Sequence, residues 1–309
     1  MAELVFSIIV PTFDRPLQLG ACLEALARLD YPKDRVEVIV VDDGGSCALE
    51  SVVAGCQDRV AVKLVRQPNG GPAIARNYGT SFATGQFLAF TDDDCEPEAN
   101  WLEAMEARLR SSPGRLIGGR TANALAHDVY AQASQMIIDA IYAHYNRAEQ
   151  EARFFTSNNL ALEARQFREM GGFHADFRLP AAEDREFCDR WRASGFGLVY
   201  AAEAGVRHSH RMSLGGFWGQ HFRYGRGAHL YHRIRRDWGG GKVPFEGLAL
   251  HWDMLRRPFR EAGALTGMRC TGLICMSQVA AVAGYLREAR GARGVGGPAE
   301  DASHAPVKE

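Results

Sequence analysis

Three consecutive aspartates, Asp92–Asp94, follow an apolar run in the segment FLAFTDDDCEP at residues 87–97. Adjacent like charges repel, so such a run is typical either of a solvated acidic turn or of a place where a cation lies among the carboxylates. Mg²⁺ and Mn²⁺ prefer oxygen ligands and often take only one or two from the protein. If the segment stays extended, Asp92 and Asp94 point the same way and Asp93 the opposite way. That spacing predicts a site for one metal ion and one ribose, with Asp93 supporting the turn.

The segment GGPAIARN at residues 70–77 places a glycine-rich turn before a helix. The first backbone N–H groups of a helix can bind phosphate, and Arg76 would add a fixed cation. The segment lacks the GK[ST] of a P-loop and the GxGxxG of a dinucleotide site, which disfavours a P-loop nucleotidase or a nicotinamide enzyme. The plain alternative for Arg76 is a surface arginine without a ligand.

A third candidate is the pair Glu183–Asp184 at the start of a predicted helix. The helix dipole stabilises a carboxylate there by ~0.3–1 kcal/mol, which lowers its pKa and keeps it ionised. The pair is either a helix cap or a general base that takes a proton from an incoming hydroxyl. A metal site, a diphosphate site and a base together predict the transfer of a group from a nucleotide diphosphate to a hydroxyl.

The elements that must position these groups are buried strands alternating with helices. Continuous β-branched runs predict strands at residues 5–10, 36–46, 61–68 and 86–90, and helical spacing follows Pro16 and Pro72. Such alternation predicts a parallel sheet with right-handed crossovers, in which ligands bind beyond the carboxyl ends of the strands. Asp14, as a helix N-cap or a ligand, and Asp42 and Asp43, as turn or ligand residues, come at those ends.

Composition excludes several classes of protein. The chain has 309 residues, 46% of them hydrophobic, and a net charge of −1, so its overall charge predicts no nucleic-acid partner. Seven cysteines, an odd number without CxxC spacing, argue against a disulfide framework and a zinc site, and favour a reducing compartment. The apolar run near the N-terminus is too short for a signal peptide.

Residues 206–241 carry seven arginines against one acid, with aromatic residues interleaved and five of the ten histidines. This composition suits an anionic membrane surface or single-stranded RNA. The apolar stretch at 270–286 is at the short edge of the membrane-spanning range. We predict a surface-packed or interfacial helix there rather than a span, with a helical subdomain packed on the catalytic domain as the alternative.

The chain resembles the family 2 glycosyltransferases with the GT-A fold over about residues 5–210. The motifs that carry the resemblance occur in the family's order and spacing: SIIVPTFDRP (7–16), VIVVDDGGS (38–46), GGPAIARNYG (70–79), FTDDDCEP (90–97), GGF (171–173) and AEDREFCDRW (182–191). The resemblance implies a hexosyltransferase-type enzyme that moves a sugar from a nucleotide-diphospho-sugar to a hydroxyl acceptor with inversion, using Mg²⁺ or Mn²⁺. It implies a single displacement at the anomeric carbon, without a covalent sugar intermediate.

The resemblance also implies roles for individual residues. Asp184 matches the usual base, with Glu183 as the runner-up, and Asp94 matches the metal ligand, with His208 or His210 as a further ligand. The residues implied in nucleotide-sugar binding are Thr12, Asp14, Arg15, Asp42, Arg76, Asp92 and Asp93. Asn158, Gln220 and Arg223 are implied on the acceptor and diphosphate side. The segment QHFRY resembles the QxxRW element of processive members, but its tyrosine replaces the tryptophan, which disfavours a polymer-extruding synthase.

We therefore predict an α/β protein with a mostly parallel GT-A sheet flanked by helices and a helical C-terminal extension. The catalytic domain would span residues 1–210, with nucleotide-sugar binding at about 1–100 and the acceptor and base part at about 101–210. A basic aromatic and helical region at 211–290, open to membrane association, and a disordered tail at 291–309 would follow.

The predicted acceptor is a lipid-linked compound, a glycan or a small hydroxyl compound, in the synthesis of cell-envelope polysaccharide or glycolipid. The predicted location is the cytoplasm, with peripheral contact to the inner face of the membrane. One rival, a sugar-1-phosphate nucleotidylyltransferase, would show a glycine-rich, lysine-containing signature where this chain reads PTFDRP. A second rival, a catalytically degenerate nucleotide-binding scaffold, would lack the DxD or the base.

Overall fold

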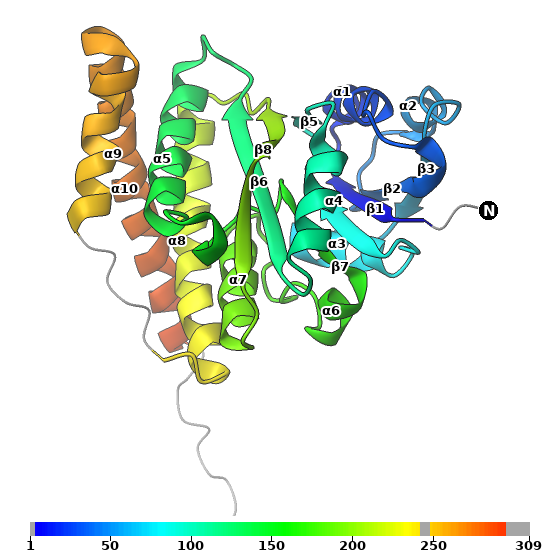
Figure 1. Cartoon of the computed structure of the whole chain (residues 1–309). Coiled ribbons are helices and arrows are strands. Elements are labelled where there is room, and N and C mark those ends of the chain that lie inside the picture. Colours follow the sequence, from blue (N-terminus) through cyan, green and yellow to red (C-terminus); the bar gives the residue numbers. More distant parts are fainter. Residues whose placement is uncertain (1–3, 242–247, 295–309) are drawn as a thin grey trace, which may run out of the picture.

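The computed structural model describes residues 4–241 and 248–294, with side chains described up to residue 291 (Figure 1). The strands are β1 (Phe6–Thr12), β2 (Val36–Asp42), β3 (Ala61–Arg66), β4 (Phe87–Phe90), β5 (Cys95–Pro97), β6 (Leu116–Asn123), β7 (Leu160–Glu163) and β8 (Leu198–His208). The α-helices are α1 (Pro16–Ala27), α2 (Glu50–Ala54), α3 (Pro72–Thr80), α4 (Trp101–Ser111), α5 (Val129–Tyr145), α6 (Ala164–Glu169), α7 (Glu183–Ala193), α8 (Leu214–Asp237), α9 (Leu248–Glu261) and α10 (Gly263–Gly294). Short 3₁₀ turns occupy Lys33–Arg35 and Glu149–Glu151.

The strands form one eight-stranded sheet in the order β3-β2-β1-β4-β7-β6-β8-β5. Strand β1 pairs in parallel with β2 and β4, and β2 pairs in parallel with β3. The predicted alternation of helices with parallel strands is therefore confirmed for the first half of the chain. The carboxyl ends of these strands lie at one edge of the sheet, where Asp14, Asp42 and Asp92 follow them.

The second half of the sheet is mixed. Strand β7 is antiparallel to β4 and β6, while β6 is parallel to β8. The short strand β5 follows the three aspartates directly and pairs antiparallel with the end of β8, so that Cys95 lies opposite His208. This pairing brings together two parts of the chain that are more than a hundred residues apart.

Hydrophobic layers cover both faces of the sheet. In β1, Ile8 and Val10 pack in one core cluster with the apolar residues of α1 and α4, while Ile9 packs in the opposite cluster with α3 and α7. This alternation is the period of two that a strand buried on both faces requires. The strand ends are thus held rigidly, which suits them to carry the polar groups of a site.

Helices α8, α9 and α10 lie beside α5 at the end of the sheet away from β1–β3 (Figure 1). Helices α8 and α10 approach closely because glycines lie at their contact. A Cβ atom at Gly225 would lie 1.8 Å from the Ala281 carbonyl oxygen, and one at Gly284 would lie 2.0 Å from the Phe222 carbonyl oxygen. The C-terminal helices are therefore packed on the rest of the protein.

Within the described residues, Gly263–Gly291 of α10 is long and apolar enough to cross a membrane by length and composition alone. In the structure this helix packs against α5, α8 and α9. It extends to Gly294, past residue 291 where we expected the tail to begin. The rest of the predicted tail, 295–309, and the segment 242–247 lie outside the described residues.

Candidate active site

The three aspartates after β4 form a turn, in which the Cys95 N–H donates to the Asp92 carbonyl oxygen at 3.1 Å. The expectation that an extended segment aims Asp92 and Asp94 the same way is therefore wrong. Asp92 accepts from Arg76 at 2.6 Å, while Asp93 accepts from the Thr12 hydroxyl at 2.7 Å. The buried bond between Asp93 and Thr12 fastens the turn to the end of β1.

Asp94 lies between two histidines from the end of β8. His208 Nε2 is 3.2 Å from one carboxylate oxygen, and His210 Nδ1 is 3.1 Å from the other. Burial raises the pKa of the Asp94 carboxyl, but its hydrogen bonds with both histidines and the charge of Arg15 outweigh this and hold the pKa well below its usual range. Asp94 is therefore ionised across the physiological range.

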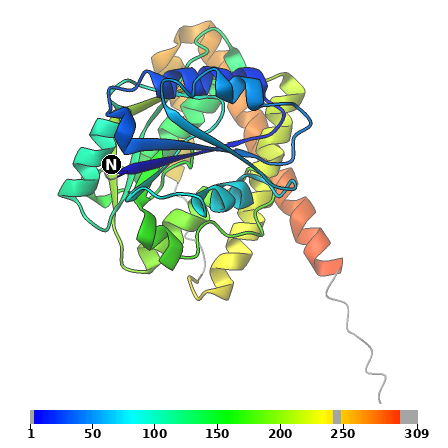
Figure 2. The same cartoon turned by 90° about the vertical axis from the view of Figure 1, so that its right-hand side faces the viewer.

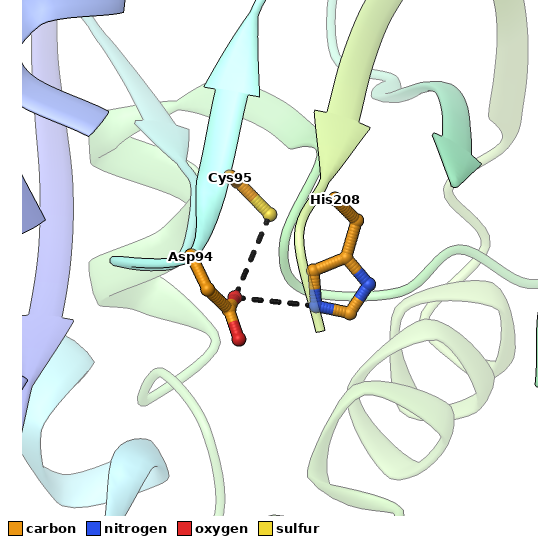
Figure 3. A group of neighbouring side chains, drawn as sticks. All are labelled: Asp94, Cys95 and His208. Carbon is orange, nitrogen blue, oxygen red and sulfur yellow. Dashed lines mark hydrogen bonds and ion pairs between the residues drawn. The ribbon is translucent and has the colours of Figure 1, made fainter. Parts of the chain in front are cut away.

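Asp94, Cys95 and His208 also form a group whose potential ligand atoms all lie within 4.8 Å of one another (Figure 3). One carboxylate and two imidazoles are a donor set that Mn²⁺ and related divalent ions accept. The Cys95 thiol is fully buried, and burial raises its pKa well above the usual value, so it is a poor ligand in this state. The candidate ligands in this group are thus Asp94 and His208, and His210 contacts the other Asp94 oxygen.

Arg15 already provides a positive charge at this turn. Its Nη1 lies 3.2 Å from an Asp93 oxygen and 3.0 Å from an Asp94 oxygen, and 43% of its side chain is exposed. Burial of Asp93 raises the pKa of its carboxyl to about 6, against the opposing charge of Arg15. Arg15 therefore partly neutralises the acidic turn and borders a pocket that α1 forms with the segment after β8.

The carboxylates after β1 and β2 are held by backbone N–H groups. Asp14 has a φ of 53° and accepts from the Ser46 and Cys47 N–H groups, so it does not cap α1, and the helix-cap alternative is wrong. Asp42 accepts from the Gly45 N–H at 2.8 Å and pairs with Arg66 at 3.1 Å. These bonds shape the loop between β2 and α2.

The glycine-rich turn before α3 faces Asp43. The Gly70 and Gly71 N–H groups donate to the two Asp43 oxygens, each at 2.8 Å. These two amides are therefore not free for a phosphate, and phosphate binding by the first N–H groups of α3 itself stays a prediction. Gly71 has a φ of 90°, and a Cβ there would lie 2.1 Å from the Arg178 carbonyl oxygen, so only glycine fits.

Arg76 is buried, with 2% of its surface exposed, and both its terminal nitrogens are paired. One nitrogen lies 2.6 Å from Asp92, and the other lies 3.0 Å from Glu183. The alternative that Arg76 is a surface arginine is therefore wrong, and both of its terminal nitrogens have carboxylate partners in this structure. Instead Arg76 links the acidic turn after β4 to the carboxylate pair at the start of α7.

Asp184 lies in the first turn of α7, directly after Ala182 and Glu183, and Ala182 has a left-handed φ of 67°. Burial and the negative charge of Glu183 raise the pKa of Asp184 to about 7, although the Arg185 N–H donates to it and Arg76 lies nearby. The prediction that the helix dipole lowers this pKa is therefore wrong, because desolvation outweighs the dipole. The residue as a whole is partly exposed.

The residues predicted on the acceptor side are placed differently from one another. Asn158 is buried and accepts from Thr156 at 2.7 Å, so it supports the segment before β7. Gln220, on α8, donates to the Tyr224 hydroxyl at 2.6 Å. Burial raises the pKa of Tyr224 to about 12, and the charge of Asp184 adds to this shift, so α8 lies within electrostatic reach of the candidate base. Arg223 is half-buried on the same helix.

Sequence reasoning missed two residues that belong to this group. Arg66 is the last residue of β3 and pairs with Asp42, so the rule of strand carboxyl ends would have found it. The sequence indicates Tyr224 only as a departure from the QxxRW element, and its electrostatic interaction with Asp184 depends on how α8 packs on α7. No local pattern indicates such a contact between helices.

The basic segment is less available than its composition indicates. Its aromatic residues Phe217 and Tyr231 are buried. Arg226 pairs with Glu288 of α10 at 2.7 Å, and Arg235 pairs with Asp189 of α7. Part of the positive charge that suggested an anionic surface thus fastens α8 to its neighbours.

Known proteins resemble this chain over the same elements. A sequence model described as glycosyl transferase family 2 matches residues 7–177. A pre-mycofactocin glycosyltransferase of Mycobacterium tuberculosis is 29% identical over 201 residues, which cover 61% of this chain and 41% of that protein. A validoxylamine A glucosyltransferase of Streptomyces hygroscopicus is 26% identical over 238 residues, covering 68% of this chain and 52% of that protein. The matched part thus spans about half the length of these relatives.

Solved structures share the fold. A mannosyltransferase from Pyrobaculum calidifontis, solved with GDP-Man and Mn²⁺, superposes with a TM-score of 0.68 at 18% identity, covering 94% of this chain and 88% of that one. Staphylococcus aureus TarS with UDP-GlcNAc gives a TM-score of 0.58 at 16% identity, covering 94% and 92%. The predicted GT-A fold with a helical C-terminal region is confirmed. Because the family model spans more than half of the residues, from β1 to the segment before α7, the chain belongs to glycosyl transferase family 2.

Proposed function

We propose that this protein transfers a sugar from a nucleotide-diphospho-sugar to a hydroxyl acceptor, with inversion at the anomeric carbon and with a divalent metal ion. The observation that carries the proposal is the convergence of Asp94 with His208 and His210 at the carboxyl edge of the sheet. Relatives named as glycosyltransferases, and a similar fold solved with GDP-Man and Mn²⁺, support the class of reaction.

Asp94, His208 and His210 would hold the metal ion. When bound, Mg²⁺ or Mn²⁺ neutralises charge on the diphosphate leaving group. The low pKa of Asp94 keeps its carboxylate ready as a ligand without a proton to displace. Arg15, paired with Asp93 and Asp94, is half exposed and therefore positioned to turn towards a diphosphate.

Asp14 and Asp42 are the proposed contacts for the nucleoside, with Thr12 as the residue that fixes the acidic turn beside them. Asp14 is exposed, and its carboxylate is oriented by the Ser46 and Cys47 N–H groups. An oriented carboxylate can accept hydrogen bonds from ribose hydroxyls or from a base. Asp92 and Arg76 would then act as the wall of the donor site rather than as direct ligands of the diphosphate.

Asp184 is the proposed general base. A carboxyl with a pKa of about 7 is suited to proton removal at neutral pH, because its carboxylate is a stronger base than that of an ordinary aspartate. Glu183 pairs with the Arg76 guanidinium, whereas Asp184 accepts from the Arg185 backbone N–H, so we assign the base to Asp184. Removal of the acceptor proton by Asp184, on the side of the sugar away from the diphosphate, gives a single displacement and hence inversion.

Acceptor binding is assigned to the surface between α7 and α8, near Gln220 and Arg223, with Asn158 as a support. We keep the predicted division into a catalytic part at 1–210 and a helical part at 211–290. A lipid-linked compound, a glycan or a small hydroxyl compound remains the predicted acceptor class. A cytoplasmic location, with contact to the inner face of the membrane, also stays a prediction.

A thermal-shift screen of nucleotide sugars and nucleoside diphosphates, with and without Mn²⁺, tests the proposal. A ligand that binds only the native protein raises its melting temperature by mass action. At least one nucleotide diphosphate should give a shift that depends on Mn²⁺. If no compound does so, the metal-dependent donor site is absent and the proposal fails.

A further inference from the structure

A second cavity lies at the amino ends of β6 and β8. It has a volume of about 430 Å³ and is bounded by the residue before β6, by residues 150–153 and by the loop from the end of α7 to the start of β8. This volume lies within the range of ligand-binding pockets in proteins, roughly 300–1,000 Å³. Three of the lining residues are arginines, Arg115, Arg153 and Arg192, and the one acid among them is Glu151. We call this region the arginine cavity.

Hydrogen bonds hold together the segments that form the arginine cavity. Arg115 Nη1 donates to the Gln150 carbonyl oxygen at 3.0 Å, which joins the segment before β6 to residues 150–153. Ala152 forms an isolated antiparallel bridge with Leu198, the first residue of β8, and both residues are buried. These contacts join all three walls of the cavity. Its frame is therefore fixed without a ligand.

The Arg115 guanidinium lies directly over the backbone of Gly197. A Cβ atom at this glycine would lie 2.7 Å from Arg115 Nη1 and 3.0 Å from its Cζ. The missing side chain at residue 197 thus leaves the space that the guanidinium occupies. Gly197 is itself held in place, since its carbonyl oxygen accepts from the Trp191 indole N–H at 3.1 Å. Arg115 is therefore a positioned cation rather than a freely moving surface side chain.

The positive charge of the arginine cavity is not balanced by neighbouring acids. Within the described residues, neither Arg115 nor Arg153 has a carboxylate at ion-pair distance. Arg192 Nη1 lies 3.9 Å from one oxygen of Asp189, whose other oxygen already pairs with an arginine of α8. Three arginines and one glutamate give the lining a net charge of +2, three minus one. A concave surface of one sign raises the local concentration of ligands of the opposite sign.

We propose that the arginine cavity is a second binding site and that it takes a small molecule bearing two phosphate groups. The planar guanidinium group of arginine binds phosphate oxygens through two parallel hydrogen bonds. The three arginines approach the cavity from three separate segments of the chain. A net charge of +2 is matched by at least two negative charges on the ligand. Two linked phosphates therefore match this lining better than one.

The arginine cavity is distinct from the candidate active site. Strand β8 has 11 residues and leads from Leu198, which lines the cavity, to His208 beside the acidic turn. At about 3.3 Å per residue, these two ends of the strand are roughly 30 Å apart. Figure 1 shows α7 in the lower half of the molecule, and Figure 2 shows α1, which borders the acidic turn, at its top. Binding in the arginine cavity therefore does not rest on the proposed sugar transfer.

Isothermal titration calorimetry of the full chain with pyrophosphate, in EDTA to remove divalent metal ions, tests the site. We expect one pyrophosphate per chain. Arg153→Gln and Arg192→Gln, both at exposed residues, should each weaken binding by about tenfold or more, because each removes charge-assisted hydrogen bonds. Gly197→Ala should also weaken it, since the added Cβ displaces Arg115. The matched control is Arg28→Gln, at an exposed arginine after α1, which should leave binding unchanged.

Four results would overturn the proposal. The first is an unchanged protein that binds no pyrophosphate at millimolar concentration. The second is a loss of binding in Arg28→Gln as large as in Arg153→Gln, because the anion would then respond only to overall charge. The third is inorganic phosphate that binds as tightly as pyrophosphate, which would exclude a ligand with two phosphates. The fourth is a loss of pyrophosphate binding in Asp94→Ala, which would place the anion in the candidate active site. None of these measurements involves sugar transfer, so they remain distinct from a failure of the proposed activity.

Discussion

The acidic turn after β4 and the acidic first turn of α7 carry the same type of side chain in opposite electrostatic environments. Two histidines and an arginine surround Asp94, and its pKa lies well below the usual range despite burial. Burial and a neighbouring glutamate dominate at Asp184, and its pKa rises to about 7. The first carboxyl is suited to hold a cation, and the second is suited to exchange a proton.

The comparison shows that the role of a carboxyl group follows from its pKa. That pKa depends on how far burial removes the group from water and on which charges lie beside it. Arg76 lies between the two regions and divides its charge between Asp92 and Glu183. It neutralises one acid in each region. The pKa values of Asp94 and Asp184 are therefore set mainly by their other neighbours, which differ between the two regions. Substitutions in each region, and in the link between them, should therefore have separable effects.

The largest expected effect is on the proton-transfer side. Asp184→Asn should lower the rate of sugar transfer by about 10²–10⁴-fold, the usual contribution of a general base, while donor binding stays intact. Transfer kinetics and a donor thermal shift check this. Asp176→Asn, at an exposed carboxylate before α7, serves as the control. If Asp184→Asn lost as much donor binding as a variant of the acidic turn, the two regions would not have separate roles.

Removing the charge of Arg76, which connects the two regions, should lower the stability of the fold. Arg76→Gln leaves the buried Glu183 and the partly exposed Asp92 without their partner, which is expected to lower the free energy of unfolding by about 3–5 kcal/mol. Urea denaturation measures it. The control is Arg165→Gln, because Arg165 also pairs with a glutamate but is 85% exposed, and should change stability by less than about 1 kcal/mol. Similar values for both variants would mean that Arg76 is not a buried link.

Loss of a metal ligand in the acidic turn should change the Mn²⁺ dependence of donor binding. Asp94→Ala should weaken the Mn²⁺ dependence of the nucleotide-induced thermal shift, with metal affinity lower by more than about 10–100-fold, the range seen even for residues that only support a ligand. The control is His232→Ala, at a partly buried histidine on α8 that is not a proposed metal ligand. It should leave the Mn²⁺ dependence unchanged. A shift that stays Mn²⁺-dependent without Asp94 would place the metal elsewhere.

The dependence of activity on pH should follow the ionisation of Asp184. A base must be deprotonated, so kcat/KM should fall about tenfold per pH unit below a pH of about 7 and level off above it. Loss of the Arg76 charge, which lowers this pKa, should move the midpoint of the remaining activity to higher pH. A profile that is flat from pH 5 to pH 8 would contradict the assignment.

The smallest effect concerns stability against pH. The folded-state pKa of Asp184 is raised, so the unfolded chain ionises first and stability declines between about pH 4, the ordinary aspartate value, and about pH 7. Asp184→Asn removes this decline and should therefore melt higher than the unchanged protein at pH 8. The difference in melting temperature should close near pH 4. A variant that is less stable at pH 8 would mean that the ionised carboxylate stabilises the fold.

Local patterns were sufficient to predict the first half of the sheet and which residues follow its strands. Runs of β-branched residues make β1 and β2 recognisable, and the carboxyl ends of parallel strands must share an edge. Asp14, Asp42 and the three aspartates could therefore be assigned to one edge of the sheet from the sequence. The pair Glu183–Asp184 was likewise recognised as the start of a helix.

Contacts over long distances in the chain decided the rest. The antiparallel pairing of β5 with β8 brings His208 to Asp94, burial turns Arg76 from a surface cation into a link, and desolvation reverses the pKa shift of Asp184. The sequence by itself determined which groups could act, because residue type and strand order are local properties. The tertiary structure decided their charge and partners, because these depend on which surfaces exclude water.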